Sequence, residues 1–316
     1  MFVEAPMQKI LISGGNGFLG SHLCDKAINE GLSVTVVDDL STSKEKQVPK
    51  DTHFIKKPVE KFDTKEKFDF VVHLAARPSP DDYTRNPLAT IDSNDVGTRN
   101  MLEIARRSNA TFLYTSTSEV YGDPDVLPIP ETYFGYVNPN GARSCYDESK
   151  RFSEALIKAY ERQYGMDVRI ERPFNVYGPR IREDGFYGRV IPRFIDQALR
   201  NKPITVYGDG KQTRSYLYFA DWLEATWKFL KDPKAKGAVL NIGSNAEISV
   251  MSLAEKILNI TKSRSRIAYL PPREEDPKRR AADISLARKI LGWEPEVGLE
   301  EGLVKTIWWL REKNRL

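Results

Sequence analysis

Two side chains suited to acid–base chemistry stand one helical turn apart. Tyr146 and Lys150 lie in the segment CYDESKRFSEAL, and a spacing of four residues places them on one face of a helix. A free tyrosine titrates at about 10, and a neighbouring ammonium favours its ionised form. Tyr207 and Lys211 repeat the spacing, but the glycines of YGDGK indicate a loop there. We therefore take Tyr146 and Lys150 as the candidate proton-transfer pair.

A second polar group follows the apolar run Thr111–Thr115. The segment TSTSEVYGDP brings several hydroxyl groups and one carboxylate to the end of this predicted strand. Thr117 is placed to hydrogen-bond a substrate hydroxyl and orient it toward Tyr146. Glu119 is placed to act on an acidic or ketonic intermediate. The alternative interpretation is a Ser/Thr-rich turn without a chemical role.

A glycine-rich segment, GGNGFLG, follows the first apolar run and opens a helical pattern. In dinucleotide-binding proteins one glycine permits a tight turn, the next lets the backbone approach a pyrophosphate, and the last lets helix and strand pack closely. Gly14, Gly17 and Gly20 have these places in a GxxGxxG variant of the pattern. The first N–H groups of the helix, around Phe18 and Leu19, face the phosphates in such a site. The segment predicts a cofactor site, with an ordinary turn as the alternative.

An acidic residue at the end of the second apolar run indicates which dinucleotide binds. Asp38 lies eighteen residues after Gly20, where a carboxylate accepts hydrogen bonds from the adenosine ribose and repels a 2′-phosphate. No arginine immediately follows it, so we expect NAD rather than NADP; a turn or N-cap aspartate is the alternative. An oxidised nicotinamide, together with Lys150, would lower the pKa of Tyr146.

Alternating apolar runs and helical patterns position these residues. They predict a doubly wound parallel α/β (Rossmann) sheet with helices on both faces and a smaller C-terminal substrate-binding lobe. We expect a cofactor domain with the catalytic residues at 1–172 and a lobe at 173–316, with 237–243 returning to the sheet. The predicted strands are 8–13, 33–37, 68–74, 111–115, 168–171, 204–207, 214–218 and 239–242. The predicted helices are 18–29, 88–108, 146–164, 190–199 and 221–230, with an irregular stretch at 177–189 and two further helices near the C-terminus.

Composition excludes several classes of protein. The chain has 316 residues, two cysteines and three histidines, and no zinc-like spacing of these residues. We therefore expect no disulfide framework and no metal site. The formal net charge of +4 is spread along the chain and does not predict nucleic-acid binding. No apolar run is long enough to span a membrane, and the start MFVEAPMQK lacks the apolar segment of a secretion signal. We expect a cytoplasmic enzyme.

The ordered segments GGNGFLG, TSTSEVYG, YDESK and RPFNVYGPR, with Asp38, resemble the extended short-chain dehydrogenase/reductases that act on nucleotide sugars. The resemblance covers almost the whole chain. It implies a catalytic triad of Thr117, Tyr146 and Lys150, in which Tyr146 removes the sugar O4 proton while C4 gives hydride to NAD. Lys150 would also hold the nicotinamide ribose. Asn175 and Arg214 match positions that bind the nucleotide diphosphate.

Within that family the chain is most similar to the UDP-glucuronate decarboxylases, on segments that include GYVNPNGARSCYDESKR and YGDGKQTRSY. The resemblance implies that Glu119 and Arg214 assist catalysis, and that Arg143 and Tyr83 lie near the sugar. Oxidation at C4 makes a β-keto acid, carbon dioxide leaves, and C4 is reduced again. A preorganised polar site would stabilise the negative charge of the enolate that forms when carbon dioxide leaves.

One feature disfavours a neighbouring activity of the family, and two depart from the decarboxylase pattern. Ser118 and Glu119 replace the Asp-Glu pair of 4,6-dehydratases, which disfavours dehydration. Arg77, in HLAARPSP, puts an unexpected charge near the nicotinamide or sugar. The segment PRIREDGFYGRVIPRF looks more like that of 4-epimerases. C4 epimerisation, C4 oxidation with release of the keto sugar, and a non-catalytic binding protein therefore stay as alternatives. The helices at 88–108 and 146–164 imply a homodimer by the same resemblance.

Overall fold

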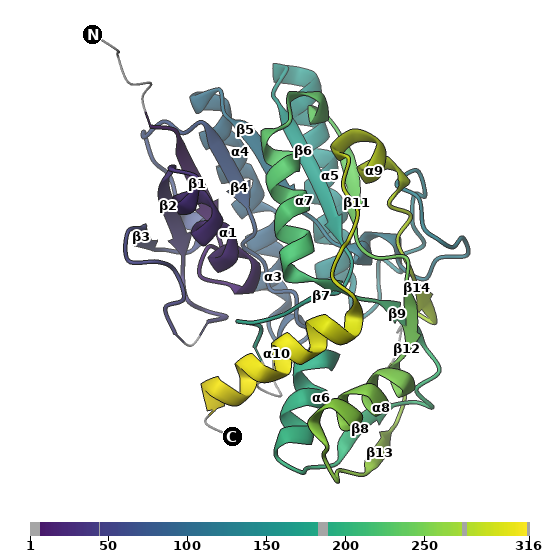
Figure 1. Cartoon of the computed structure of the whole chain (residues 1–316). Coiled ribbons are helices and arrows are strands. Elements are labelled where there is room, and N and C mark those ends of the chain that lie inside the picture. The colour runs from purple at the N-terminus through teal and green to yellow at the C-terminus, as the bar shows by residue number, and fades with distance from the viewer. Residues whose placement is uncertain (1–6, 44, 183–188, 274–276, 315–316) are drawn as a thin grey trace.

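The computed structural model describes residues 7–43, 45–182, 189–273 and 277–314, and its centre is a seven-stranded sheet (Figure 1). The strands lie in the order β11-β6-β5-β4-β1-β2-β3, and all neighbouring pairs are parallel. The predicted doubly wound α/β fold is confirmed. The strands are β1 Lys9–Ser13, β2 Ser33–Asp38, β3 His53–Lys56, β4 Phe70–His73, β5 Thr111–Thr115, β6 Val168–Pro173 and β11 Val239–Ile242.

Helices cover both faces of the sheet because its inner strands are apolar on both sides. The consecutive residues Val71 and Val72 of β4 belong to different cores, as the alternation of side chains along a strand requires. Figure 1 shows α1 and α7 on the near face, with α4 and α5 behind the sheet. The helices of these layers are α1 Phe18–Asn29, α2 Pro80–Tyr83, α3 Pro87–Asn94, α4 Val96–Ser108, α5 Ser144–Tyr164, α7 Phe219–Lys231 and α9 Ser285–Leu291.

The chain beyond β6 builds a third core around Phe194, Leu253 and Leu303, below the sheet in Figure 1. Its helices are α6 Val190–Leu199, α8 Val250–Thr261 and α10 Leu299–Asn314. The short strands pair as β7 with β10, β9 with β12 and β14, and β8 with β13. They are β7 Val176–Tyr177, β8 Ile204–Tyr207, β9 Thr213–Ser215, β10 Leu217–Tyr218, β12 Glu247–Ser249, β13 Ile267–Leu270 and β14 Arg279–Arg280, and the 3-10 turns are η1 Val59–Lys61, η2 Ser118–Tyr121 and η3 Pro233–Ala235.

The predicted helix at 88–108 is wrong in one respect, because it is broken at Asp95 into α3 and α4. The Asn94 carbonyl accepts hydrogen bonds from the hydroxyls of Thr98 and Ser153. Side-chain hydroxyls that bind a carboxyl-end carbonyl compete with the backbone and bend helices. The break gives two shorter helices in place of one long one.

Three further differences concern elements of weak sequence signal. The predicted strand 214–218 is two strands, β9 and β10, that pair with different partners. The edge strand β3 and helix α8 have no counterpart in the prediction, although Ser249 caps α8 by accepting a hydrogen bond from the Ser252 amide at 3.0 Å. The predictions for residues 1–6 and for 183–188 of the irregular stretch lie outside the described residues.

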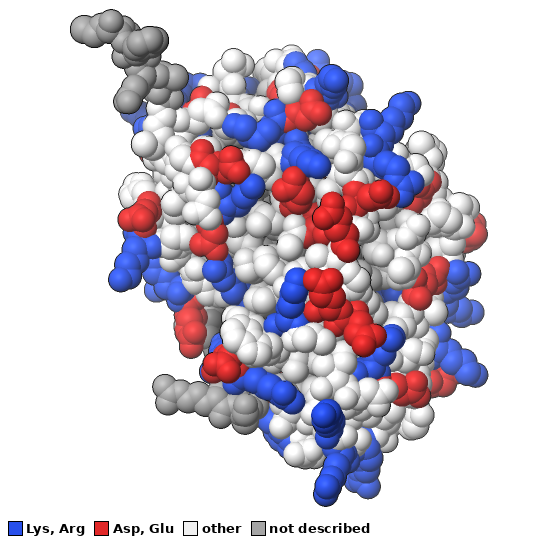
Figure 2. Space-filling view, viewed as in Figure 1, with Lys and Arg blue, Asp and Glu red and all other residues white. Residues whose placement is uncertain are grey.

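The surface carries charges of both signs. Figure 2 shows Lys and Arg intermixed with Asp and Glu over the face of α7 and α10. Within the described ranges, no helix is both long enough and apolar enough to cross a membrane.

Candidate active site

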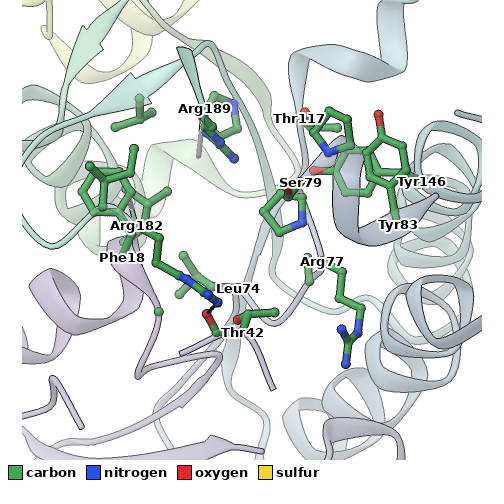
Figure 3. Close-up of a pocket in the computed structure, with 18 of the residues that line it drawn as sticks. Phe18, Thr42, Leu74, Arg77, Ser79, Tyr83, Thr117, Tyr146, Arg182 and Arg189 are labelled. Atoms are coloured by element: carbon green, nitrogen blue, oxygen red, sulfur yellow. Dashed lines mark hydrogen bonds between the residues drawn. The ribbon is translucent and has the colours of Figure 1, made fainter. Parts of the chain in front are cut away.

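One cavity of about 420 Å³ lies at the carboxyl ends of the central strands, where ligands bind in open α/β sheets (Figure 3). The cavity is lined by residues of the central sheet and its connections and by residues of the elements after β6, from the β1–α1 turn to β14. The structure brings every predicted site residue to its wall, namely Gly14, Gly17, Phe18, Leu19, Gly20, Asp38, Arg77, Tyr83, Thr117, Glu119, Arg143, Tyr146, Lys150, Asn175 and Arg214.

The glycine turn at the start of α1 forms one end of the cavity. Gly14 has a φ of +70°, and a Cβ there would lie 2.6 Å from the Ala75 nitrogen. A Cβ on Gly20 would lie 2.3 Å from the Gly14 carbonyl oxygen, so any side chain would push α1 away from β1. Gly17 stands at the N-cap of α1 and faces the cavity. The turn thus exposes the N-terminus of α1, which attracts anions.

Asp38 ends β2 beside this turn, with its carboxylate held from two directions. Its oxygens accept the backbone N–H groups of Asn16 at 3.0 Å and Leu40 at 2.8 Å. Burial raises the pKa of Asp38, and these two hydrogen bonds oppose the rise. Backbone amides therefore orient the carboxylate at the cavity wall, and no lysine or arginine of the described residues forms an ion pair with it.

The catalytic candidates Tyr146 and Lys150 lie in the first two turns of α5, and both are buried. The Lys150 ammonium donates to the Thr115 carbonyl at 2.9 Å, and burial lowers its pKa to about 7. Burial raises the pKa of Tyr146 to about 12, against the opposing effects of Arg189 and a hydrogen bond with Thr117. The protein's own groups therefore leave Tyr146 protonated at neutral pH, and burial outweighs the effect expected from the lysine.

Thr117 and Tyr83 both contact Tyr146. Thr117 caps η2 by accepting the Glu119 amide at 3.2 Å and comes to lie against the Tyr146 ring (Figure 3). The Tyr83 ring stacks on that of Tyr146 with centroids 5.3 Å apart and planes 6° apart. The buried Tyr83 hydroxyl has no hydrogen-bond partner within the described residues. The two contacts fix the plane and the tilt of the Tyr146 ring.

A carboxylate clamped by two arginines adjoins the tyrosines. Glu119 forms ion pairs with Arg143, from the start of α5, and with Arg280, from β14. Although burial opposes ionisation, Arg280 and Arg143 hold the pKa of Glu119 well below its usual range. Arg143 also reaches Asp147 at 3.4 Å. Glu119 is thus a fixed anion rather than an acid with a proton to give.

Arg280 is the residue that sequence reasoning missed. It lies 161 positions after Glu119, in the basic run KRRAADI, which contains no motif that singles it out. Arg214, which the resemblance paired with Glu119, is the register neighbour of Arg280 across β9 and β14 and lowers the pKa of Glu119 from there. Only the pairing of these two short strands brings both arginines to Glu119.

Asn175 precedes β7 and is hydrogen-bonded to Ser215, the residue after Arg214 in β9. The Asn175 amide donates to the Ser215 carbonyl at 2.9 Å, with a left-handed φ of +40°. Arg214 is buried and donates to the Thr213 carbonyl at 2.8 Å. Both side chains are held at the cavity wall.

Arg77 is held by an acid. Its guanidinium contacts both oxygens of the buried Asp82, at 3.2 and 3.0 Å, and Figure 3 shows it pointing away from Tyr146 and Thr117. Asn86 donates to the same carboxylate at 2.8 Å. The unexpected charge is thus neutralised by Asp82, which precedes Tyr83 in helix α2.

A family model described as "NAD dependent epimerase/dehydratase family" matches residues 10–243. The chain belongs to this family. It is 42% identical over 308 residues to UDP-glucuronic acid decarboxylase 1 of Danio rerio, covering 96% of this chain and 73% of the relative. It is 43% identical over 303 residues to UDP-glucuronic acid decarboxylase 3 of Arabidopsis thaliana, covering 94% and 87%.

Solved structures of the epimerase/dehydratase type have the same fold. UDP-glucose 4-epimerase of Thermotoga maritima, determined with UDP-glucose, is similar with a TM-score of 0.91 and 32% identity over 97% of this chain and all (100%) of that one. MoeE5, determined with UDP-glucuronic acid and NAD, is similar with a TM-score of 0.86 and 28% identity, covering 96% and 99%.

The cofactor of an NAD dependent epimerase/dehydratase fits the residues present. Side chains at Gly14 and Gly20 would clash with the Ala75 backbone and the Gly14 carbonyl and would distort the turn that faces a pyrophosphate in such sites. The same cavity is lined by Asp38 and Lys150. The oriented Asp38 carboxylate suits ribose hydroxyls. These groups and the arginine-clamped Glu119 line the same cavity.

Proposed function

We propose that the protein is an NAD-dependent UDP-glucuronate decarboxylase that makes UDP-xylose. The identity of 42–44% to decarboxylases over 93–98% of the chain supports the reaction class. The observation that carries the proposal is the pairing of Arg143 and Arg280 with Glu119 in the cavity that Tyr146 also lines, because two guanidinium groups in the sugar site suit a substrate with a carboxylate there.

In this proposal residues 1–172 hold NAD and the catalytic side chains, and residues 173–316 mainly hold the nucleotide sugar. Gly14, Gly17 and the amides of Phe18 and Leu19 face the pyrophosphate, and Asp38 binds the adenosine ribose. The chemistry supplied by bound NAD is reversible removal of hydride from sugar C4, and its positive ring favours the ionised form of Tyr146. Asn175 and Arg214 bind the diphosphate of the sugar nucleotide.

Tyr146 moves the proton of the sugar O4 hydroxyl. The Thr117 hydroxyl takes part in this proton transfer, because it hydrogen-bonds Tyr146 and lines the same cavity. Lys150 is fixed by the Thr115 carbonyl, so its ammonium stands at a constant distance from the ring. Stacking on Tyr83 keeps the phenol oxygen aimed at the substrate. A positioned general base contributes about 10²- to 10⁴-fold to such a step.

The arginine-clamped carboxylate acts in the decarboxylation step. When carbon dioxide leaves the β-keto acid, the bonding electrons move into the C4 carbonyl and negative charge develops on oxygen. Arg143 and Arg280 are already in place near this charge, so little reorganisation is needed to stabilise it. Glu119 holds both guanidinium groups and orders them.

The state of Glu119 argues against dehydration. A dehydratase needs an acid to protonate the leaving hydroxyl, whereas two arginines keep the pKa of Glu119 low and Ser118 stands in the preceding position. Arg77 has no direct part in this mechanism, because Asp82 binds it.

A UDP-sugar 4-epimerase is the second candidate, favoured by the likeness to the Thermotoga maritima epimerase. The purified protein is incubated with UDP-glucuronate and, separately, UDP-glucose, and the products are weighed by mass spectrometry. Loss of carbon dioxide from UDP-glucuronate supports the decarboxylase. Unchanged mass with new stereochemistry supports the epimerase, loss of two hydrogens with lasting NADH supports an oxidase, and no change in either sugar supports a binding protein.

We also propose a homodimer, formed through the outer faces of α3, α4 and α5. Leu88, Ile91, Val96 and Phe152 are exposed there by 75%, 36%, 39% and 46%. Apolar groups gathered on neighbouring helices are typical of an interface. Sedimentation of wild type and of Phe152→Glu tests this: a wild-type monomer refutes it. The cytoplasmic location stays a prediction, to be tested by cell fractionation.

A further inference from the structure

A glutamate without a counter-ion lies inside the sheet next to the catalytic strand. Glu171, on β6, has no exposed surface. Its carboxyl oxygens accept three hydrogen bonds, from the Thr115 hydroxyl at 2.7 Å, the Thr226 hydroxyl at 2.8 Å and the Trp222 indole N–H at 3.1 Å. No lysine, arginine or histidine of the described chain forms an ion pair with it. Burying such a group is costly unless it is hydrogen-bonded.

The three donors come from two different elements. Trp222 and Thr226 lie on α7, which covers this face of the sheet, whereas Thr115 is the last residue of β5. Thr115 and Glu171 are register partners in the parallel pair β5–β6, and the Ser116 amide donates to the Glu171 carbonyl at 2.8 Å. Glu171 therefore binds the end of β5 through backbone and side chain together, and ties it to α7.

That strand end carries the proposed catalytic machinery. The Thr115 carbonyl accepts the Lys150 ammonium at 2.9 Å, and Thr117, two residues further on, meets Tyr146. A change in the position of Thr115 would therefore move both Lys150 and Thr117 relative to Tyr146.

A second, half-buried network holds the neighbouring residue, Ser116. The Ser116 hydroxyl donates to Glu154 of α5 at 2.6 Å, and Arg172 of β6 binds both oxygens of Glu154 at 3.0 and 2.6 Å. Glu154 is paired with the cationic Arg172. Glu171, by contrast, has no cationic partner among the described residues, so its carboxyl group is held in place by neutral donors alone.

We propose that Glu171 is a positioning residue for the reaction: by accepting the Thr115 hydroxyl, it fixes the carboxyl end of β5 and with it Lys150 and Thr117. This inference rests on the proposed function for the identity of the reaction, but its geometric part concerns only the strand end. Glu171 does not line the cavity and acts through Thr115.

Two matched variants separate positioning from general stability. Thr115→Val and Thr226→Val each remove one hydroxyl donor to Glu171, and only the first loosens β5; the Thr115 carbonyl is kept in both. With UDP-glucuronate we expect Thr115→Val to lower kcat by about 10- to 100-fold, since displacements of about 1 Å are that costly, with KM nearly unchanged. Thr226→Val is expected to keep kcat within about threefold.

Two more variants test the carboxyl itself. The Thr115 hydroxyl and the Trp222 N–H donate to the same oxygen of Glu171. Glu171→Gln keeps an amide oxygen that can accept both, and its NH₂ group faces Thr226, so it is expected to retain most of kcat. Glu171→Ala removes the acceptor of the Thr115 hydroxyl, so its kcat is expected to fall as much as that of Thr115→Val. Amide hydrogen exchange of a peptide that spans residues 115–121 gives a readout without substrate, and should speed up in Thr115→Val and not in Thr226→Val.

Equal kcat and equal exchange in the two threonine variants would overturn the proposal, as would Glu171→Gln as slow as Glu171→Ala. If the wild type does not turn over UDP-glucuronate, the proposed function fails, and the exchange measurement then decides on Glu171 alone: equal exchange rejects it and faster exchange in Thr115→Val supports it.

Discussion

Replacing Arg280 by glutamine tests the charge that the site places near the sugar. The Arg280 side chain is only 3% exposed, and it pairs with Glu119 and donates to the Gly122 carbonyl at 3.2 Å. Glutamine keeps a hydrogen-bonding head of smaller reach but removes the positive charge. Arg279→Gln is the matched control, because Arg279 is the preceding residue, is exposed and pairs with Glu247 at 2.7 Å on the other side of β14.

The size of the effect follows from the contacts. A hydrogen bond to a charged group contributes about 1.5–3 kcal/mol, so losing Arg280 should move the pKa of Glu119 upward, toward its ordinary range. Glu119 keeps Arg143 and therefore stays ionised near neutral pH. The larger loss is in rate, since removing one preorganised donor from a developing negative charge costs about 10²- to 10³-fold.

The assay is a single turnover of UDP-glucuronate with carbon dioxide and NADH absorbance followed together. We expect Arg280→Gln to release carbon dioxide about 100-fold more slowly than wild type, whereas C4 oxidation slows less, so that NADH accumulates. Arg279→Gln should behave as wild type. Carbon dioxide release within about threefold of wild type in Arg280→Gln, or equal slowing in Arg279→Gln, would refute the reasoning.

Three further predictions concern other residues. Tyr146→Phe keeps the ring that stacks on Tyr83 but lacks the phenol oxygen, so NADH formation should vanish while NAD affinity, measured by calorimetry, stays within about threefold; comparable turnover would show that Tyr146 is not the base. Asp38→Ala should reduce the ratio of NAD to NADP affinity about tenfold or more, and an unchanged ratio would reject its role at the ribose. Burial raises the pKa of Glu171 from 4.5 to about 7, so the native state holds a proton that the unfolded chain releases, and this contribution to stability is lost as pH rises from about 4.5 to 7. The unfolding free energy of wild type relative to Glu171→Gln should thus fall by up to about 3 kcal/mol over that range, and a difference independent of pH would contradict the shift.

Much of the scaffold was predictable because its signals are local. The strands β1, β2 and β5 are short apolar runs, β6 alternates apolar Val168 and Ile170 with charged residues, and α1 begins at Phe18 directly after the glycine turn, as predicted. Weak local signals explain the misses. The edge strand β3 is half exposed, and the break at Asp95 depends on hydroxyl contacts to Asn94 that include one from α5.

For the site, the sequence by itself determined which side chains reach the cavity from motifs near strand ends: the glycine turn, Asp38, Thr117, and the pair Tyr146 and Lys150. Parallel strands bring their carboxyl ends to one edge, so residues at those ends must meet wherever they stand in the chain.

The tertiary structure alone decided the electrostatics. Arg280 forms an ion pair with Glu119, which lies 161 positions earlier in the chain. Asp82 forms an ion pair with Arg77 and neutralises its charge. Glu171 accepts hydrogen bonds from three donors that lie on two different elements. Burial depends on the packing of several segments, and it raises the pKa of Tyr146 and lowers the pKa of Lys150. Residue type and spacing determine which groups arrive at the site, whereas their charge depends on neighbours and on solvent exclusion, and both come from the packing of distant segments.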